Sequence, residues 1–268
     1  MLNIQLLSLD LDGTLLNSQR RISDENINAL MKAKSKGVKI VINTGRPLVS
    51  TLEYLSLLNL YGSNEYSITY NGGLVQKNDG TILSKKLLSY EEVEQIAAMA
   101  RKRDFPCDII SDDSSYTIEF GRKSKLSYVN NTLSFQKISL DQLPQKAEFN
   151  KVIISAESIE LDRLQNEIDT DFLNSFEVFR TAPVLLEVMP KGVSKATGLE
   201  KLCEYLEIPA AAVLAMGDEA NDAPMLRWAG LGIAPANAKK VAQEAADKIS
   251  DFSNDEDTIA EALKTFVL

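Results

Sequence analysis

The chain has 268 residues, enough for one large domain or for two modest ones that each have a core. Hydrophobic residues make up 44% of it, which is typical of a globular protein, and the net charge of −9 weighs against nucleic acid or an anionic membrane surface as a partner. Histidine is absent, which excludes Ser-His-Asp and Cys-His catalysis and histidine-ligated zinc. Any metal must then be held by oxygen ligands, which favours magnesium.

No apolar stretch approaches membrane-spanning length, and no basic segment followed by an apolar one opens the chain. We therefore expect no membrane partner, no signal peptide and a cytoplasmic location. Cys107 and Cys203 lie far apart in the sequence, and we interpret them as buried free thiols in a reducing compartment.

Strands and helices alternate along the first part of the chain. Apolar runs at residues 6–11 and 38–42 predict two strands. A helix is predicted directly after Ser23, and another begins at Pro47. This order predicts a parallel sheet covered by helices, with ligands at the carboxyl ends of its strands.

The pattern changes after about residue 67. Turn signals at residues 71–73 and 78–80 separate short apolar strands, which indicates an antiparallel excursion. Helices follow over about 90–103 and 159–173. Further strands are predicted over residues 107–111, 116–120, 149–155, 176–181 and 184–189. We interpret residues 83–189 as an inserted α+β domain.

The alternating pattern returns from residue 194. Helices are predicted over residues 194–206, 223–228, 238–247 and 258–266, and strands over 213–216 and 231–234. The expected fold is α/β, with a Rossmann-like doubly wound parallel sheet formed by residues 1–82 and 190–268. Residues 83–189 would be inserted into this core as an α+β cap, or lid.

The first predicted strand ends in two carboxylates, Asp10 and Asp12, which Gly13 and Thr14 follow directly. Aspartate is unfavourable in a buried strand, so Asp10 calls for an explanation. Two such acids could bind a hard cation, and one of them could act as a nucleophile in phosphoryl transfer. Asp-Gly is also typical of a type I′ hairpin turn, although residues 15–18 show no returning strand pattern.

Polar residues also follow the second strand and precede a later helix. Thr44 and the backbone N–H groups beyond it could bind phosphate oxygens, and Gly45 would permit close approach, although a simple helix cap explains the pattern as well. Lys195 lies where Ser194 is predicted to cap a helix. Lysine at such a position is usually solvated.

The strand at residues 213–216 leads into a further pair of acids. Asp218 comes directly after this buried strand, where no structural role accounts for it. Asp222 is a candidate N-cap residue with Pro224 in the first helical turn. If strand ends meet at one edge of the sheet, Asp10 and Asp218 could hold magnesium while Thr44 and Lys195 bind phosphate oxygens.

These segments match the four ordered motifs of a known superfamily. They are Asp10-Leu11-Asp12-Gly13-Thr14, Thr44-Gly45-Arg46, Lys195, and Gly217-Asp218-Glu219-Ala220-Asn221-Asp222. The chain thereby resembles the haloacid dehalogenase superfamily. Its long insertion between the second and third motifs is similar to that of the Cof-type branch of sugar-phosphate phosphatases, as are Asn71-Gly72-Gly73, Pro190-Lys191-Gly192-Val193-Ser194-Lys195 and Asn221-Asp222-Ala223-Pro224-Met225.

The resemblance implies a role for each catalytic and metal-binding residue. Asp10 would be the nucleophile that becomes an aspartyl phosphate. Asp12 would be the general acid and then the base, and its backbone carbonyl would also bind Mg²⁺. Asp218 would be the acidic metal ligand, with Asp222 as a further ligand or a partner of the ligands. The catalytic residues Thr44 and Lys195 would orient and neutralise the phosphate.

The resemblance also implies a substrate side. Gly45, Arg46, Asn71 and Asn221 would bind substrate, although Asn71 is equally part of an Asn-Gly hairpin signal. The implied function is magnesium-dependent hydrolysis of small phosphorylated metabolites, above all sugar phosphates, by a monomer or homodimer. The alternatives are a phosphomutase of the same superfamily, or a phosphatase of a phosphorylated cofactor such as pyridoxal phosphate or flavin mononucleotide. The sequence does not reveal the physiological substrate.

Overall fold

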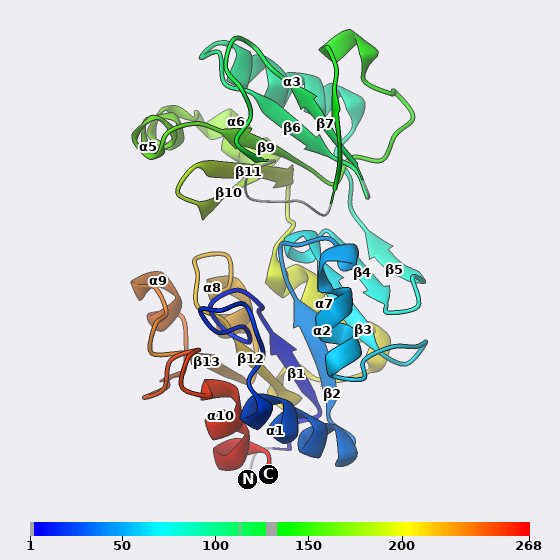
Figure 1. Ribbon diagram of the computed structural model, residues 1–268, viewed down its shortest axis with the longest axis vertical. Coiled ribbons are helices and arrows are strands. Elements are labelled where there is room, and N and C mark those ends of the chain that lie inside the picture. The colour runs from blue at the N-terminus through cyan, green and yellow to red at the C-terminus, as the bar shows by residue number, and fades with distance from the viewer. Residues whose placement is uncertain (1–2, 113, 127–132) are drawn as a thin grey trace. The chain divides into compact units, whose positions relative to one another are not determined.

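The computed structural model describes residues 3–112, 114–126 and 133–268 (Figure 1). The chain divides into two compact units. Met1–Lys85 and Ser194–Leu268 form the first, which we call the core unit, and Lys86–Val193 form the second, which we call the inserted unit. The borders predicted from the sequence lie at 82/83 and 189/190, a few residues earlier in the chain.

A sheet of eight strands within the described residues forms the centre of the core unit, in the order β14-β13-β12-β1-β2-β3-β4-β5 (Figure 1). The strands are β1 (Leu6–Leu9), β2 (Lys39–Asn43), β3 (Tyr66–Thr69), β4 (Leu74–Lys77), β5 (Ile82–Lys85), β12 (Val213–Met216), β13 (Leu231–Ala234) and β14 (Lys248–Ile249). Neighbours from β14 to β3 run parallel, and β4 and β5 turn back antiparallel. The predicted α/β fold, with its antiparallel excursion, is confirmed.

Helices cover both faces of this sheet. Leu7 and Leu9 on β1 belong to the core cluster that includes residues of α1, α2 and α10, whereas Leu6 belongs to the cluster that includes residues of α7, α8 and α9. The helices are α1 (Asp24–Ser35), α2 (Leu52–Leu57), α7 (Lys195–Leu206), α8 (Ala223–Trp228), α9 (Lys240–Gln243) and α10 (Thr258–Phe266), with short 3₁₀ turns η1 (Leu48–Thr51), η2 (Tyr70–Gly72) and η4 (Ala210–Ala212). Alternate side chains of a strand point to opposite faces, so strands covered on both sides are largely apolar.

One prediction near the C-terminus is wrong. The helix predicted over residues 238–247 shrinks to α9, and an unpredicted edge strand, β14, follows it. Asp247 is the physical reason. Its N–H donates to the carbonyl of Gly232 at 2.9 Å, and its carboxylate accepts the N–H of Gly232 at 2.8 Å. These two bonds draw the chain onto the edge of β13 and end the helical path.

The inserted unit has its own sheet of six strands among the described residues, in the order β10-β11-β9-β6-β7-β8. The strands are β6 (Cys107–Ile110), β7 (Ser114–Ile118), β8 (Ser134–Lys137), β9 (Lys151–Ser155), β10 (Phe176–Ala182) and β11 (Leu185–Pro190). Its helices are α3 (Tyr90–Arg101), α5 (Ser158–Glu167) and α6 (Thr170–Ser175), with the 3₁₀ turn η3 (Leu140–Gln142). An apolar core joins the sheet to α3 and α5.

Two predictions in the inserted unit need correction. The single helix predicted over residues 159–173 is two helices, α5 and α6. Ile168 is extended, with ψ 124°, and Asp169 then caps α6 by accepting the N–H of Phe172 at 2.8 Å. The strand predicted over 116–120 lies two residues earlier, as β7. No helix in the described part of the chain is both long enough and apolar enough to cross a membrane.

Candidate active site

The candidate site is built from segments that follow neighbouring strands of the core sheet. β1 lies between β12 and β2, all three parallel, so their carboxyl ends lie side by side. Asp10 follows β1, Thr44 follows β2, and Asp218 comes two residues after β12. Lys195 is the first residue of α7, on the face of the sheet that α7 and α8 cover.

Lys195 is buried, with 1% of its surface exposed, rather than solvated. Its ammonium contacts a carboxylate oxygen of Asp10 and lies 2.5 Å from Oδ1 of Asp222. Burial alone would lower the pKa of this lysine, but the two carboxylates outweigh it and raise the pKa of Lys195 above its ordinary value. The residue is therefore a fixed positive charge among acids.

Three buried carboxyl groups cluster at this site, and two of them contact the ammonium. Asp10, Asp218 and Asp222 each offer an oxygen, and these oxygens lie within 4.8 Å of one another. Burial raises the pKa of Asp10 despite the opposing effect of Lys195, and burial together with Asp222 raises the pKa of Asp218 to about 6. The cluster sets three carboxyl groups against one ammonium, and all its candidate metal donors are oxygens. This donor set fits a hard divalent cation such as Mg²⁺.

Asp222 stands at the predicted N-cap position of α8, with Pro224 in the first turn, but its side chain makes no capping bond to this helix. Its Oδ2 accepts the backbone N–H of Asp218 at 3.0 Å and that of Glu219 at 2.9 Å, while Oδ1 faces Lys195. The carboxylate is thus turned back toward the end of β12 instead of toward the first turn of α8. One fully buried side chain organises the loop after β12 and pairs with the lysine of α7.

The loop after β1 is folded around Asp218. Thr14 donates its hydroxyl to Oδ1 of Asp218 at 2.8 Å. Gly13 has φ +81°, and a Cβ atom there would lie 2.4 Å from Oδ2 of Asp218. Glycine is needed for the backbone angle and for this close approach. The Asp-Gly hairpin that the sequence also permits is not formed, because both strands beside β1 are parallel to it.

Asp12 is the most open of the predicted catalytic groups. Its side chain is 56% exposed, and Nε of Arg46 donates to Oδ2 of Asp12 at 2.8 Å. A second guanidinium nitrogen contacts the other oxygen, so the pair is bidentate. The guanidinium also lies over the ring of Tyr54, 5.9 Å from its centroid. Arg46 is thereby held against the proposed acid–base group.

Thr44 and Asn71 are tied together by the backbone. The Asn71 N–H donates to the Thr44 carbonyl at 3.0 Å, and the Thr44 hydroxyl accepts the Arg46 N–H at 3.2 Å. Asn71 and Gly72 have φ values of 53° and 97°, so the predicted turn is present. The Asn71 side chain also accepts from the amide of Asn221 at 3.0 Å. Asn71 therefore belongs both to the turn and to the group of predicted site residues.

The N-terminus of α7 rests directly on this turn. A Cβ atom on Gly72 would lie 1.9 Å from the carbonyl oxygen of Ser194, and one on Gly198 would lie 2.7 Å from Cα of Gly72. Main chain therefore contacts main chain at the point where Lys195 enters the site.

Three residues with no role predicted from the sequence also lie at this site. Thr14 bonds to Asp218, Asn43 bonds to the backbone carbonyl of Lys195 at 3.1 Å, and Asn237 donates to the carbonyl of Gly13 at 2.8 Å. For Asn43 the available signal is a polar residue that ends a buried apolar run.

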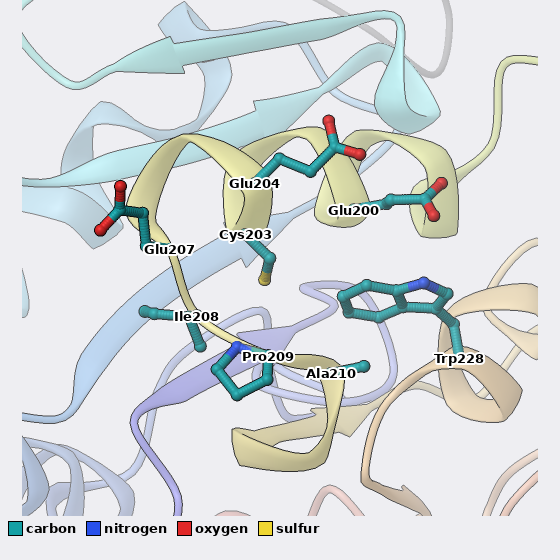
Figure 2. A pocket seen from close by; sticks show the side chains of 8 residues that line it. All are labelled: Glu200, Cys203, Glu204, Glu207, Ile208, Pro209, Ala210 and Trp228. Atoms are coloured by element: carbon teal, nitrogen blue, oxygen red, sulfur yellow. The ribbon is translucent and has the colours of Figure 1, made fainter.

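A pocket with a largely apolar lining lies toward the C-terminal ends of α7 and α8. Its volume is about 520 Å³. Figure 2 shows its side chains, with three glutamates of α7 and its C-cap above an apolar lining. The lining residues are Glu200, Cys203, Glu204, Glu207, Ile208, Pro209, Ala210 and Trp228. Lys195 and Asp222 lie at the opposite ends of these two helices, so this pocket is separate from the acid cluster.

Comparison with known proteins gives the family. The family model of the haloacid dehalogenase-like hydrolases matches residues 7–263. The Bacillus subtilis protein YxeH is 34% identical over 98% of both chains, and 5-amino-6-(5-phospho-D-ribitylamino)uracil phosphatase YcsE of the same organism is 31% identical over 99% of this chain and 97% of its own. The structure of BT4131, a sugar phosphatase of subclass IIB, superposes with a TM-score of 0.80 at 26% identity, covering 97% of this chain and 98% of that one. The chain belongs to the haloacid dehalogenase-like hydrolases, and the resemblance seen in its motifs is confirmed.

Proposed function

We propose that this protein is a magnesium-dependent phosphatase that hydrolyses small phosphorylated metabolites through an aspartyl phosphate on Asp10. The observation that carries the proposal is the buried ammonium of Lys195, held between Asp10 and Asp222. An anionic nucleophile can approach an anionic phosphate only if positive charge is fixed beside it. Lys195 supplies that charge without any rearrangement.

Asp10, Asp218 and Asp222, with the backbone carbonyl of Asp12, would hold the metal ion. When bound, Mg²⁺ supplies positive charge that neutralises phosphate oxygens. Thr44 would donate its hydroxyl to one of these oxygens. Arg46, Asn71 and Asn221 would contact the substrate, and the glycine at position 45 leaves room for it beside Asn71.

The reaction would proceed in two steps. In the first, a carboxylate oxygen of Asp10 forms a bond to phosphorus, the bond to the leaving oxygen breaks, and Asp12 gives its proton to that oxygen. In the second, Asp12 takes a proton from water, the water oxygen attacks phosphorus, and the Asp10–phosphorus bond breaks. Asp10 is regenerated as a carboxylate, Asp12 is protonated again, and inorganic phosphate is released.

Sugar phosphates are the first substrate class in this proposal, because BT4131 is a sugar phosphatase. Phosphates of ribityl compounds, such as flavin mononucleotide, are the second, because the substrate in the name of YcsE carries a 5-phospho-ribityl group. The inserted unit would act as a lid that excludes water and selects the leaving group.

The test is the Asp10→Asn variant, assayed for phosphate release from p-nitrophenyl phosphate and from a panel of sugar phosphates, pyridoxal phosphate and flavin mononucleotide. The variant should fold as the wild type does and lose turnover by about three or more orders of magnitude. Near-normal hydrolysis by it would refute the nucleophile assignment. Conversion of a hexose 1-phosphate into its isomer without free phosphate would identify a phosphomutase instead.

A further inference from the structure

Asn43 is a fully buried polar residue at the end of β2, directly before Thr44. Side chains alternate along a strand, so Asn43 points to the same face as Val41, which packs in the cluster that includes residues of α7 and α8. A buried amide costs free energy unless its groups are bonded, so the position requires an explanation.

The amide nitrogen of Asn43 joins three segments of the site. It donates to the backbone carbonyl of Lys195 at 3.1 Å and to the hydroxyl of Ser8 at 3.2 Å, and it lies 3.6 Å from the sulfur of Met225. Ser8 lies two residues before Asp10, and Met225 lies three residues after Asp222. The amide therefore sits where the backbones that carry the nucleophile, the lysine and the buried acid converge.

The other half of the same amide is unsatisfied. The carbonyl oxygen of Asn43 is buried and has no hydrogen-bond partner among the described residues. An orphaned acceptor of this kind lowers stability, whereas an apolar side chain of the same shape would avoid the penalty. Stability alone does not account for asparagine at this position, and the donor on its nitrogen is what the site uses.

We propose that Asn43 is a positioning residue, which fixes the first turn of α7 so that the ammonium of Lys195 stays between Asp10 and Asp222. The inference rests on the proposed phosphatase function. Asn43 itself touches no reacting atom in this proposal. Its bond to the carbonyl of Lys195 holds the main chain from which the ammonium extends, and displacement of a charged group by about 1 Å costs on the order of 10²-fold in rate.

The principal variant is Asn43→Leu, which keeps nearly the same shape, removes the donor and also removes the orphaned oxygen. We expect a midpoint of urea unfolding equal to or above that of the wild type, together with a fall in kcat of about 10²-fold. KM for p-nitrophenyl phosphate should stay within about threefold, because substrate contacts are unchanged. A merely structural role predicts the opposite pairing, with stability lost and kcat kept.

The matched control is Asn26→Ala. Asn26 is another buried asparagine of the core unit, and it accepts the N–H of Ala260 at 2.9 Å, where it joins α1 to α10 on the other face of the sheet. This variant should lose stability and keep its kcat. If Asn43→Leu does not fold, Asn43→Ala, which also lacks the donor but cannot overpack, takes its place with the same expected fall in kcat.

A double-mutant cycle with Lys195→Met tests whether Asn43 acts through the lysine. Adding Asn43→Leu to Lys195→Met should change the residual kcat by less than about threefold, against about 10²-fold in the wild type. Wild-type kcat in both Asn43 variants, or an undiminished effect in the cycle, would overturn the inference while leaving the phosphatase proposal intact. Failure of the wild type to hydrolyse any phosphomonoester, with Mg²⁺ present, would instead overturn the proposed function and the inference with it.

Discussion

The ammonium nitrogen of Lys195 lies 2.5 Å from Oδ1 of Asp222, and both side chains are buried, with 1% and 0% of their surface exposed. Asp222 in turn bonds to the backbone that carries Asp218. One ion pair therefore connects α7, which carries Lys195, to the loop after β12, which carries Asp218 and Asp222.

Lys195→Met removes the positive charge that lies among three carboxylates. We expect kcat/KM to fall by about 10³-fold or more and the free energy of unfolding to fall by about 3–5 kcal/mol, because breaking a buried ion pair leaves uncompensated charge. Steady-state kinetics and urea unfolding measure the two effects. Lys264→Met is the control, since Lys264 pairs with Glu261 at an exposed surface and its removal should leave both quantities unchanged. Equal effects of the two variants would contradict the role given to Lys195.

Magnesium should stabilise the folded protein. At a concentration of 100 times Kd, a ligand that binds only the folded state adds about 2.7 kcal/mol to the free energy of unfolding. Calorimetry should show Tm rising with Mg²⁺ concentration, and chelation should abolish both the rise and the hydrolytic activity. Asp218→Asn should lose most of the stabilisation, whereas Asp79→Asn, in an exposed turn, should keep it. Full activity in excess chelator would exclude the metal from the reaction.

The contribution of Asp218 to the stability of the metal-free protein should decrease as the pH rises from about 4 to about 7. Burial and Asp222 raise the pKa of Asp218 to about 6, above its ordinary value of 3.8. The folded protein then holds this proton more tightly than the unfolded chain, so the stabilising contribution is complete below about pH 4 and is lost as the pH passes through about 6. In the presence of chelator, the wild type should lose up to about 3 kcal/mol relative to Asp218→Asn over this range. A difference that is independent of pH would show that the Asp218 carboxyl titrates normally.

Gly13→Ala and Gly37→Ala separate backbone strain from steric contact. Both glycines have positive φ, +81° and +88°. An added Cβ atom would lie 2.4 Å from Asp218 at position 13, whereas at position 37 it would meet no described residue within 4 Å. Gly37→Ala should cost about 1–2 kcal/mol, the price of the left-handed backbone alone. Gly13→Ala should cost more, because Asp218 must move, and it should also weaken stabilisation by Mg²⁺. Thermal unfolding with and without Mg²⁺ measures the loss of stability and the stabilisation by the ion. An equal loss of stability in the two variants would show that the loop after β1 can shift to accommodate the added Cβ atom.

The core fold could be predicted because each strand and helix is indicated by several residues together. The strand at Val213–Met216 and the helix at Thr258–Phe266 are apolar patterns with clear ends, and both lie where the sequence analysis places them. Ser23 also caps α1 as expected, accepting the N–H of Asn26 at 3.2 Å. Because several residues form each pattern, a single residue that departs from it does not hide the strand or helix.

The site contains details that no local pattern carries. Lys195 is buried only because two carboxylates from distant segments meet it, and nothing next to it in the sequence indicates this. Asp222 occupies a capping position, yet its carboxylate bonds in the opposite direction because β12 ends nearby. Asn43 shows its function only when the start of α7 is placed beside the end of β2.

The contact of Gly72 with the start of α7 has a consequence for how this enzyme can vary. Because main-chain atoms touch there, the spacing between the helix of Lys195 and the turn at Gly72 depends on glycine at positions 72 and 198. Substitutions elsewhere can change which substrates fit, while the contact between Gly72 and the start of α7 keeps Lys195 in place. A larger residue at either glycine would therefore push against the main chain beside Lys195.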